Sequence, residues 1–366
     1  MNGIVITTLL SVLLLLACGN SNNGTYKDYT DARLKVARSY ADYASAEYDL
    51  LRATASTLNT RADAFTQEPN AQSLADIREA LHRCRTQWQN IAPFQFGPAV
   101  DVALRSALNT YPTDIDRVEA NISSNNYTLG SIENLDAEGY AAIGYLLYGI
   151  NSSEQQVIEN FSSPDASYRI NYLLDLTERI QTLTEQVALK WASSSGEYYN
   201  GFVSKESLGT DVGSALSLIV NAYELYLQRF LRDGKVGIPA GVRSAGVPRP
   251  VAIESYFEGT SVSYLTTSMR AMKQIYTGEF GIDNYALYDY IVELDFQDLA
   301  DEIVLQWDEV ILLAEELEEP LQDQIASDND AVLAVFLELQ KLIPMVKSDM
   351  ASAMGVIITN QDADGD

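Results

Sequence analysis

The sequence predicts an all-α protein built from two helical-bundle domains. Apolar residues recur at spacings of three and four over most of the chain, and no segment shows the alternation expected of a strand. With 366 residues, of which 47% are hydrophobic and 20% charged, the chain can bury a large core. Each half opens with a long helical hairpin, so we expect residues 28–160 and residues 161–366, which end in an acidic tail, to be bundles related by duplication.

The N-terminus has the features of a lipoprotein signal peptide. Its apolar stretch, residues 4–17, is shorter than the ~20 residues that cross a bilayer and fits the core of a signal peptide. The run LLAC at residues 15–18 resembles a bacterial lipobox, in which a peptidase cuts before the cysteine and the cysteine then carries lipid. We therefore expect residues 1–18 to be a lipoprotein signal peptide that ends in the lipobox cysteine, Cys18. Cleavage before Cys18 would leave this residue at the new N-terminus, where its lipid would hold the protein on a membrane.

The next residues, 19–27, are mostly small and polar, which suits a flexible tether. An aspartate directly after the lipidated cysteine would favour the inner membrane, but the residue at that position is Gly19. We therefore expect the protein to be anchored in the outer membrane of the cell envelope, on either its periplasmic or its outer side. An ordinary signal peptide and a weak anchor helix are the alternatives.

The charge balance excludes one class of partner. Asp and Glu outnumber Lys and Arg by 51 to 24, which gives a formal net charge of −27. A field of that sign repels phosphate backbones, so we expect no nucleic-acid partner.

Two long helices with a sustained heptad-like seam are predicted at the start of the folded region. The first ends at Glu68-Pro69, and its apolar positions are Leu34, Ala37, Ala41, Ala44, Tyr48, Leu51, Ala55, Leu58, Ala62 and Phe65. The second, in which Ser73 with Asp76 resembles a capping box, has apolar positions Leu74, Ile77, Leu81, Cys84, Trp88 and Ile91. Cys84 is thus expected to be a buried structural thiol, and the two helices an antiparallel pair.

The rest of the chain continues the helical pattern. Further helices are expected at about 99–109, 138–149, 173–191, 212–230, 260–277, 285–318 and 329–356. Between two of them lies "GKVGIPAGVRSAGVPRP", residues 234–250, which carries Lys235, Arg243 and Arg249 and no acid. This basic, irregular loop is either a plain connection or a functional loop, because long ordered loops are often functional.

Several stretches together resemble the imelysin-like family of bacterial envelope proteins. They are "LHRCRTQWQNIAPFQFGP" (81–98), "YPTD" (111–114), "EGYAAIGYLLYG" (138–149), "GIPAGVRSAGVPRP" (237–250), "ESYFEG" (254–259) and "GVIITNQDADGD" (355–366). The resemblance implies two helical bundles, a secreted, periplasmic or lipid-anchored location, and a link to iron through uptake or binding. The family was once classed with metallopeptidases because of a motif Gly-x-His-x-x-Glu.

This chain lacks the histidine and the glutamate of that motif. Matched from Gly139, the histidine position is Ala141 and the glutamate position is Gly144. His and Glu three apart share a helix face and can reach one metal, whereas Ala and Gly cannot. His82 is the only histidine in the chain, and it is expected to be an ordinary histidine on a polar face or rim. A metallopeptidase is therefore not expected, and no catalytic or metal-ligating residue is assigned.

The remaining candidates point to binding. Residues expected to line what is left of the family's pocket are Tyr140, Ala141, Gly144, Tyr145, Tyr148, Arg83, Trp88, Arg243 and Ser244. An arginine beside a Gly-rich loop can hold a carboxylate or phosphate, so an anionic or polar small ligand is expected. The resemblance implies iron or haem as that ligand and an outer-membrane uptake partner. The alternative is a surface protein that has lost its pocket and binds a protein or glycan.

Overall fold

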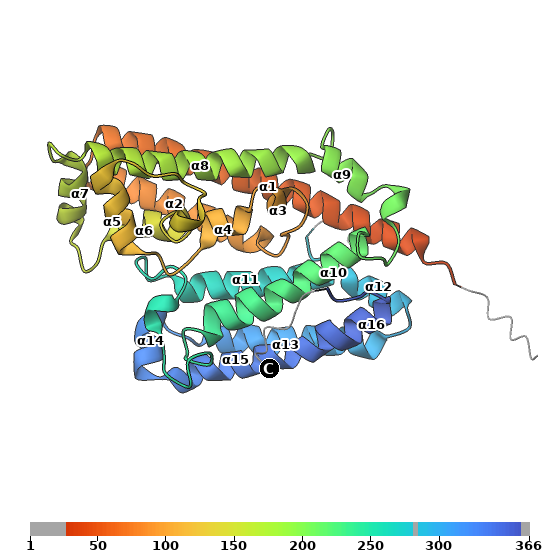
Figure 1. Ribbon diagram of the computed structural model, residues 1–366. Helices are drawn as coiled ribbons and strands as arrows, with labels where there is room; N and C mark the ends of the chain where they lie inside the picture. The colour runs from red at the N-terminus through yellow and green to blue at the C-terminus, as the bar shows by residue number, and fades with distance from the viewer. Residues whose placement is uncertain (1–26, 281–284, 360–366) are drawn as a thin grey trace, which may run out of the picture.

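The computed structural model describes residues 27–280 and 285–359, and it confirms the all-α prediction, since these residues form helices and no strand. The helices lie in two layers (Figure 1). One layer holds α1 (Thr30–Gln67), α2 (Ala71–Ile91) and α8 (Ser167–Trp191), and the other is formed by the helices after residue 214. Cys18, the lipobox and the end of the acidic tail fall outside the described residues.

The α1–α2 hairpin forms as its apolar seam predicts. Nine seam positions of α1, from Ala37 to Phe65, are buried, and Leu34 at the start is half-buried. Alanine at many of these positions lets neighbouring helices approach closely. The N-cap of α2 is Asn70, whose side chain accepts the N–H groups of Gln72 and Ser73, while the Ser73 hydroxyl accepts the N–H of Asn70. The capping box therefore lies one turn earlier than predicted.

The short elements before residue 214 cover the ends and one side of this layer (Figure 1). They are α3 (Pro98–Asp101), α4 (Leu104–Asn109), α5 (Ile115–Ser124), η1 (Ile132–Asn134), α6 (Gly139–Tyr148), α7 (Glu154–Ser162), α9 (Glu197–Phe202) and η2 (Lys205–Ser207). The single helix expected at 99–109 is interrupted, because Ala103 adopts a left-handed conformation with φ 49°.

The second layer begins with α10 (Ala215–Leu225), which continues without a break into a π-helix, η3 (Tyr226–Gly237). It goes on with η4 (Pro250–Ala252), α11 (Ser261–Thr277), α12 (Leu287–Glu293), α13 (Gln297–Glu315), α14 (Leu321–Ser327), α15 (Asn329–Pro344), η5 (Met345–Met350) and α16 (Ala351–Met354). The helix expected at 285–318 is divided in two, and Asp295 in the break has φ 68°.

Packing groups α8 with the N-terminal helices. α8 lies along α1 for much of its length (Figure 1). The predicted boundary between residues 160 and 161 falls before α8, so the first layer extends further along the chain than residue 160. The division into two domains and their duplication stay predictions.

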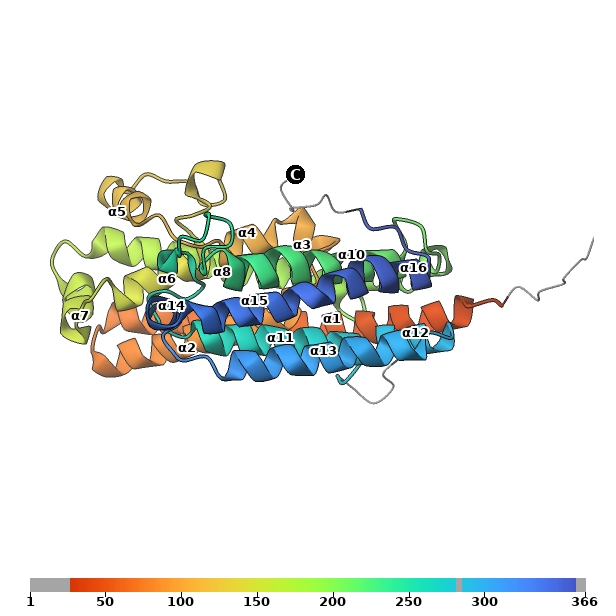
Figure 2. The same ribbon diagram turned by 90° about the horizontal axis from the view of Figure 1, so that it is seen from below.

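The two layers meet where α2 packs against α11, with further contacts from α1 to α10 and α12 (Figure 2). This junction places residues of the first hairpin beside η3 and the loop that follows it. Within the described part of the chain, none of the helices combines the length and the apolar character that a membrane crossing requires.

Candidate functional site

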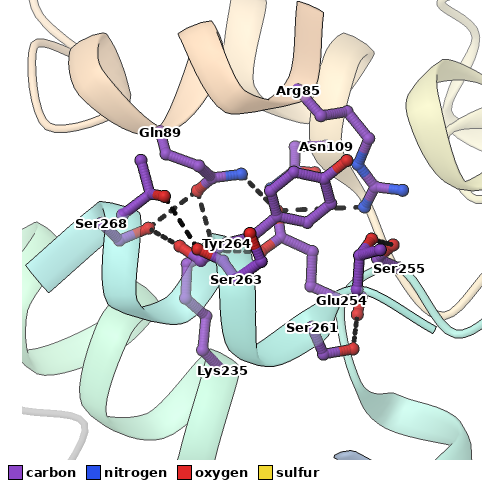
Figure 3. Close-up of polar contacts among 12 residues, drawn as sticks. Arg85, Gln89, Asn109, Lys235, Glu254, Ser255, Ser261, Ser263, Tyr264 and Ser268 are labelled. Atoms are coloured by element: carbon purple, nitrogen blue, oxygen red, sulfur yellow. Dashed lines mark hydrogen bonds and ion pairs between the residues drawn. The ribbon is translucent and has the colours of Figure 1, made fainter. Parts of the chain in front are cut away.

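A buried network of charged side chains lies at the junction of the two layers (Figure 3). α2 contributes Arg85 and Gln89, η3 contributes Lys235, and the loop before α11 contributes Glu254, and all four are at most 4% exposed. Lys235 forms an ion pair with the Glu254 carboxylate and donates to Gln89 Oε1 over 2.9 Å. Gln89 Nε2 and Asn109 Nδ2 donate to Glu254 Oε1 at 3.0 and 2.8 Å. Five polar groups from four segments thus meet in the core.

The surroundings of Glu254 favour its charged form. Burial by itself would raise the pKa of this carboxyl, but the positive charges of Lys235 and Arg85 and the hydrogen bonds from Lys235 and Gln89 hold the pKa below its ordinary value. The carboxylate is therefore expected to be ionised and to compensate two buried cations, which would otherwise cost several kcal/mol each.

Glu258 forms the second branch of the network. Its Oε1 accepts from Arg85 Nη1 at 2.5 Å, and its Oε2 accepts from the hydroxyls of Ser255 at 2.8 Å and Tyr264 at 3.3 Å. His82 Nδ1 lies 3.0 Å from the Tyr264 hydroxyl, so the single histidine, expected on a polar face or rim, lies half-buried at the edge of this network.

The Glu258 carboxylate also explains the glycine inside α6. A Cβ added to Gly144 would lie 2.7 Å from Glu258 Oε1, closer than real contacts allow. The position that carries glutamate in the family's motif is thus bare, and a glutamate from a segment over a hundred residues later lies against it. At the start of the helix Gly139 has φ 73°, and an added Cβ would meet the carbonyl oxygen of Leu108 at 2.5 Å, so glycine is required there for two reasons.

Ala141, at the motif's histidine position, lines a cavity of about 220 Å³. The other lining residues are Arg85, Tyr111, Pro112, Thr113, Ile115, Ile150, Val251, Ile253, Ser255, Tyr256 and Phe257. We call this space the motif cavity. Most of the residues that line it are apolar or aromatic.

A larger pocket of about 560 Å³ lies on the other side of Tyr111 and Pro112, which line both spaces. Five of its lining side chains are basic and one, Asp233, is acidic, and the basic ones are Arg105, Arg229, Lys235, Arg243 and Arg249. We call it the basic pocket. The residues of the predicted basic loop thus line a pocket together with η3 and α4.

Arg243 and Asp233 are partners inside the basic pocket. Arg243 Nη2 and Nε donate to Asp233 Oδ2 at 2.7 and 3.2 Å, and Asp233 Oδ1 accepts from the buried Arg232. Arg105 lies with its guanidinium 3.8 Å from the centroid of the Phe230 ring, and burial lowers the pKa of Arg105 to about 10, which still leaves it charged at neutral pH.

The structure brings only some of the predicted site residues together. Tyr140, Ala141 and Gly144 adjoin Arg85 and Glu258, but the Tyr140 hydroxyl points to Cys84 Sγ at 3.4 Å. Cys84 is buried, as predicted, and burial raises its pKa to about 11, so it is an inert thiol at neutral pH.

The other predicted residues have separate partners. Tyr145 donates to Glu119 Oε1 at 2.7 Å, and the Tyr148 ring lies under the Arg78 guanidinium. Arg83 is on the surface, paired with Glu79 at 2.6 Å.

Trp88 and Ser244 have roles within the fold. Trp88 is a core side chain with Arg105 above its ring. The Ser244 hydroxyl donates to the carbonyl oxygen of Val247 in its own loop, at 2.6 Å.

Sequence reasoning missed the residues that form the network. One signal was present for Arg85, which stands four residues after Leu81 and three before Trp88 and therefore on the apolar face of α2. Lys235 is predicted only as part of the basic loop. Glu254 and Glu258 carry no such signal, because they lie in an irregular loop that has no period against which a buried charge stands out.

A sequence model of the imelysin family, named as a peptidase family, matches residues 44–343, most of the chain. The chain belongs to the imelysin family. A search among curated proteins finds no match.

Two solved structures share the fold of this imelysin-family protein. One is a protein from Parabacteroides distasonis described as an iron-regulated protein A precursor, with a TM-score of 0.70 and 17% identity, covering 89% of this chain and 97% of its own. The other is an imelysin-like protein from Psychrobacter arcticum, with a TM-score of 0.68 and 12% identity, covering 91% of this chain and 99% of its own. Because the sequence identities are this low, the two comparisons show only that the fold is shared.

Within residues 27–280 and 285–359, His, Cys, Asp and Glu side chains do not gather in any group of three or more that could hold a metal ion. Glu254 and Glu258 both face basic partners, which is the arrangement of an ion-pair network rather than a cation site.

Proposed function

We propose that this imelysin-family protein is a non-catalytic binding protein of the cell envelope that holds an anionic small ligand in the basic pocket. The observation that carries the proposal is the gathering of five basic side chains around one space of about 560 Å³ in a chain whose net charge is −27. A volume of this size lies within the ~300–1,000 Å³ typical of small-ligand sites.

Two of the basic side chains are available to a ligand. Arg229 and Arg249 are exposed, and neither forms an ion pair with any carboxylate in the part of the chain that the structure describes. Arginine binds carboxylate and phosphate groups through two parallel N–H donors. A pocket whose charged lining is mainly basic also concentrates anionic ligands, which matters in a protein whose overall field would repel them.

The loss of the motif supports a role without catalysis. Ala141 and Gly144 replace the histidine and glutamate, and the nearby Glu258 is engaged by Arg85, Ser255 and Tyr264. A carboxylate that is hydrogen-bonded on both oxygens and ion-paired is a poor general base. Binding is then the function that the remaining groups can perform.

The link to iron rests on the relatives. One neighbour in fold is described as an iron-regulated protein A precursor. We infer that the anionic ligand is a ferric chelate, whose carboxylates rather than protein side chains would hold the metal. The lipid on Cys18 would attach the protein to the outer membrane, where an uptake partner would deliver or receive the chelate; haem, with two propionates, is the second candidate.

Thermal unfolding of the purified protein with citrate, ferric citrate, haem or inorganic phosphate tests the proposal. A ligand that binds the folded state at 100 times its Kd adds ~2.7 kcal/mol of stability, and we expect ferric citrate to raise Tm accordingly. The double variant Arg229→Gln/Arg249→Gln should weaken binding at least tenfold.

A matched control separates the pocket from net charge. Arg52→Gln/Arg270→Gln removes the same charge from two surface ion pairs, with Asp49 and Glu315, outside the pocket and should leave the affinity unchanged. If both double variants weaken binding equally, or no probe shifts Tm, the proposal is wrong and the surface-interaction alternative gains support.

A further inference from the structure

We propose that the motif cavity is a second binding site and that it takes a small neutral aromatic molecule. This goes beyond the function proposed above, because the ligand carries no charge and the lining is apolar rather than basic. The cavity has a volume of about 220 Å³. That exceeds the ~150 Å³ of an engineered apolar cavity known to bind benzene, so a single-ring molecule has room here.

The wall of the motif cavity favours an aromatic ligand. Three of its side chains are rings, those of Tyr111, Tyr256 and Phe257. The Tyr256 and Phe257 rings meet edge to face with their centroids 5.3 Å apart, and the Phe257 centroid lies 5.5 Å from that of Tyr145. Rings held by other rings offer edges and faces against which a further ring packs with a specific geometry.

The charge around the cavity favours a neutral ligand. Among the described residues that line it, Arg85 alone is charged, and its side chain is fully buried and paired with Glu258. Lys235, the other buried cation of the network, is paired with Glu254. Two cations and two carboxylates thus compensate one another, and a charged ligand would enter an apolar space without a counter-charge, which is unfavourable.

The polar groups of the wall also have partners within the chain. The Thr113 hydroxyl donates to the carbonyl oxygen of Asp136 at 2.6 Å, and the Ser255 hydroxyl donates to Glu258 Oε2 at 2.8 Å. A buried water usually makes ~2–4 hydrogen bonds, and few groups remain here to form them. Replacing poorly held water by an apolar molecule is favourable.

The backbone of the segment that carries two of the rings is strained. Ser255 has φ 62°, in the left-handed region that residues other than glycine seldom adopt. It stands between Glu254, which belongs to the buried network, and Tyr256 and Phe257, which line the cavity. Strain of this kind persists only where the surroundings fix it, and it is frequent at ligand sites.

The cavity has an apolar mouth and an unfilled position in its wall. Ile150 and Val251 line it and are 53% and 54% exposed, so they stand where it meets solvent. Ala141 contributes a single methyl group at the position where the family's motif has histidine. A larger side chain at this position would occupy space that the ligand needs.

Calorimetric titration of the purified protein with toluene tests the site, with benzoate and benzylammonium as its charged isosteres. We expect toluene to bind at least tenfold more tightly than either ion, because only the neutral molecule leaves the charge balance of the cavity wall unchanged. This comparison uses the natural protein and needs no variant.

Variants then locate the bound molecule. Ala141→Leu should weaken toluene binding at least tenfold by filling the cavity, whereas Ala53→Leu adds the same side chain at an exposed position of α1 and should leave the affinity unchanged. Circular dichroism and Tm check the folding, and Ala141→Val replaces Ala141→Leu if the latter unfolds.

The double variant Arg229→Gln/Arg249→Gln separates this proposal from the first. It should leave toluene affinity unchanged, because Arg229 and Arg249 line the basic pocket and not the motif cavity. The two proposals can therefore fail independently.

Three results would overturn the proposal. They are the absence of toluene binding, equal affinity for toluene and one of the ions, and full toluene affinity in a folded Ala141 variant. Binding of N-acetylphenylalaninamide without binding of toluene would assign the cavity to an apolar side chain of a protein partner and would overturn it as well.

Discussion

Gly144 shows how one missing side chain connects two distant segments. In an isolated helix, glycine would cost about 1 kcal/mol relative to alanine. Here it leaves room for the Glu258 carboxylate, which Arg85, Ser255 and Tyr264 hold against α6. The local cost is offset by contacts that join the two layers.

This arrangement predicts that Gly144→Ala destabilises the protein in spite of its better helix propensity. The new Cβ would displace a carboxylate that is fixed by three partners, and disturbing buried charged hydrogen bonds costs ~1–3 kcal/mol. Urea unfolding gives the change in free energy.

The double-mutant cycle with Glu258→Ala identifies the cause. Without the carboxylate, Gly144→Ala should become neutral or stabilising, because only the propensity term remains. A stabilising effect of Gly144→Ala in the natural background would contradict this account of the glycine.

At the scale of elements, the periodic helices could be predicted and their ends and interruptions could not. The seam of α1 and the position of α11 follow from repeated burial of one face, a signal summed over many residues. The cap of α2, the breaks at Ala103 and Asp295 and the π-helix η3 each depend on one or two residues and on tertiary contacts. Of these, η3 contributes most to the candidate site, because it carries Lys235 into the core and Arg229 to the basic pocket.

The cap of α2 gives a prediction at this scale. Asn70→Ala removes the acceptor of two backbone N–H groups and should destabilise the protein by ~1 kcal/mol. Asn70→Asp keeps an acceptor and should cost much less. Equal losses of Tm in the two variants would show that the cap does not stabilise this helix.

At the scale of the whole molecule, the two layers are joined through compensated buried charges. Glu254 lies between Lys235, Arg85 and Gln89, and these partners come from both layers. Removing one member of such a network leaves the others buried without compensation, at ~3–5 kcal/mol.

Glu254→Gln should therefore destabilise the protein by ~3–5 kcal/mol at pH 7, as judged by urea unfolding. The pKa of Glu254 is depressed in the folded state, so its stabilisation is fully present above the unfolded pKa of ~4.3 and is lost as the pH falls through the folded pKa. The slope of stability with pH below about 4.3 should be smaller in Glu254→Gln.

Glu79→Gln is the matched control for that substitution. It removes an exposed carboxylate paired with Arg83 within one helix and should cost under ~0.5 kcal/mol. If the two glutamine variants lost the same free energy of unfolding, the buried network would not contribute more to stability than an exposed ion pair, and the prediction would be wrong.

The sequence by itself determined the all-α class, the α1–α2 hairpin, the burial of Cys84 and the absence of the motif's histidine and glutamate. These features depend on periodicity along the chain or on residue identity, and both can be read without coordinates. Only the tertiary structure decided what stands at the bare positions: Glu258 against Gly144, a cavity beside Ala141, and Arg85 with two donors free. Charges on segments as far apart as α2 and the loop before α11 meet only when the two layers pack, because burial in the core depends on contacts between segments and not on spacing within any one of them.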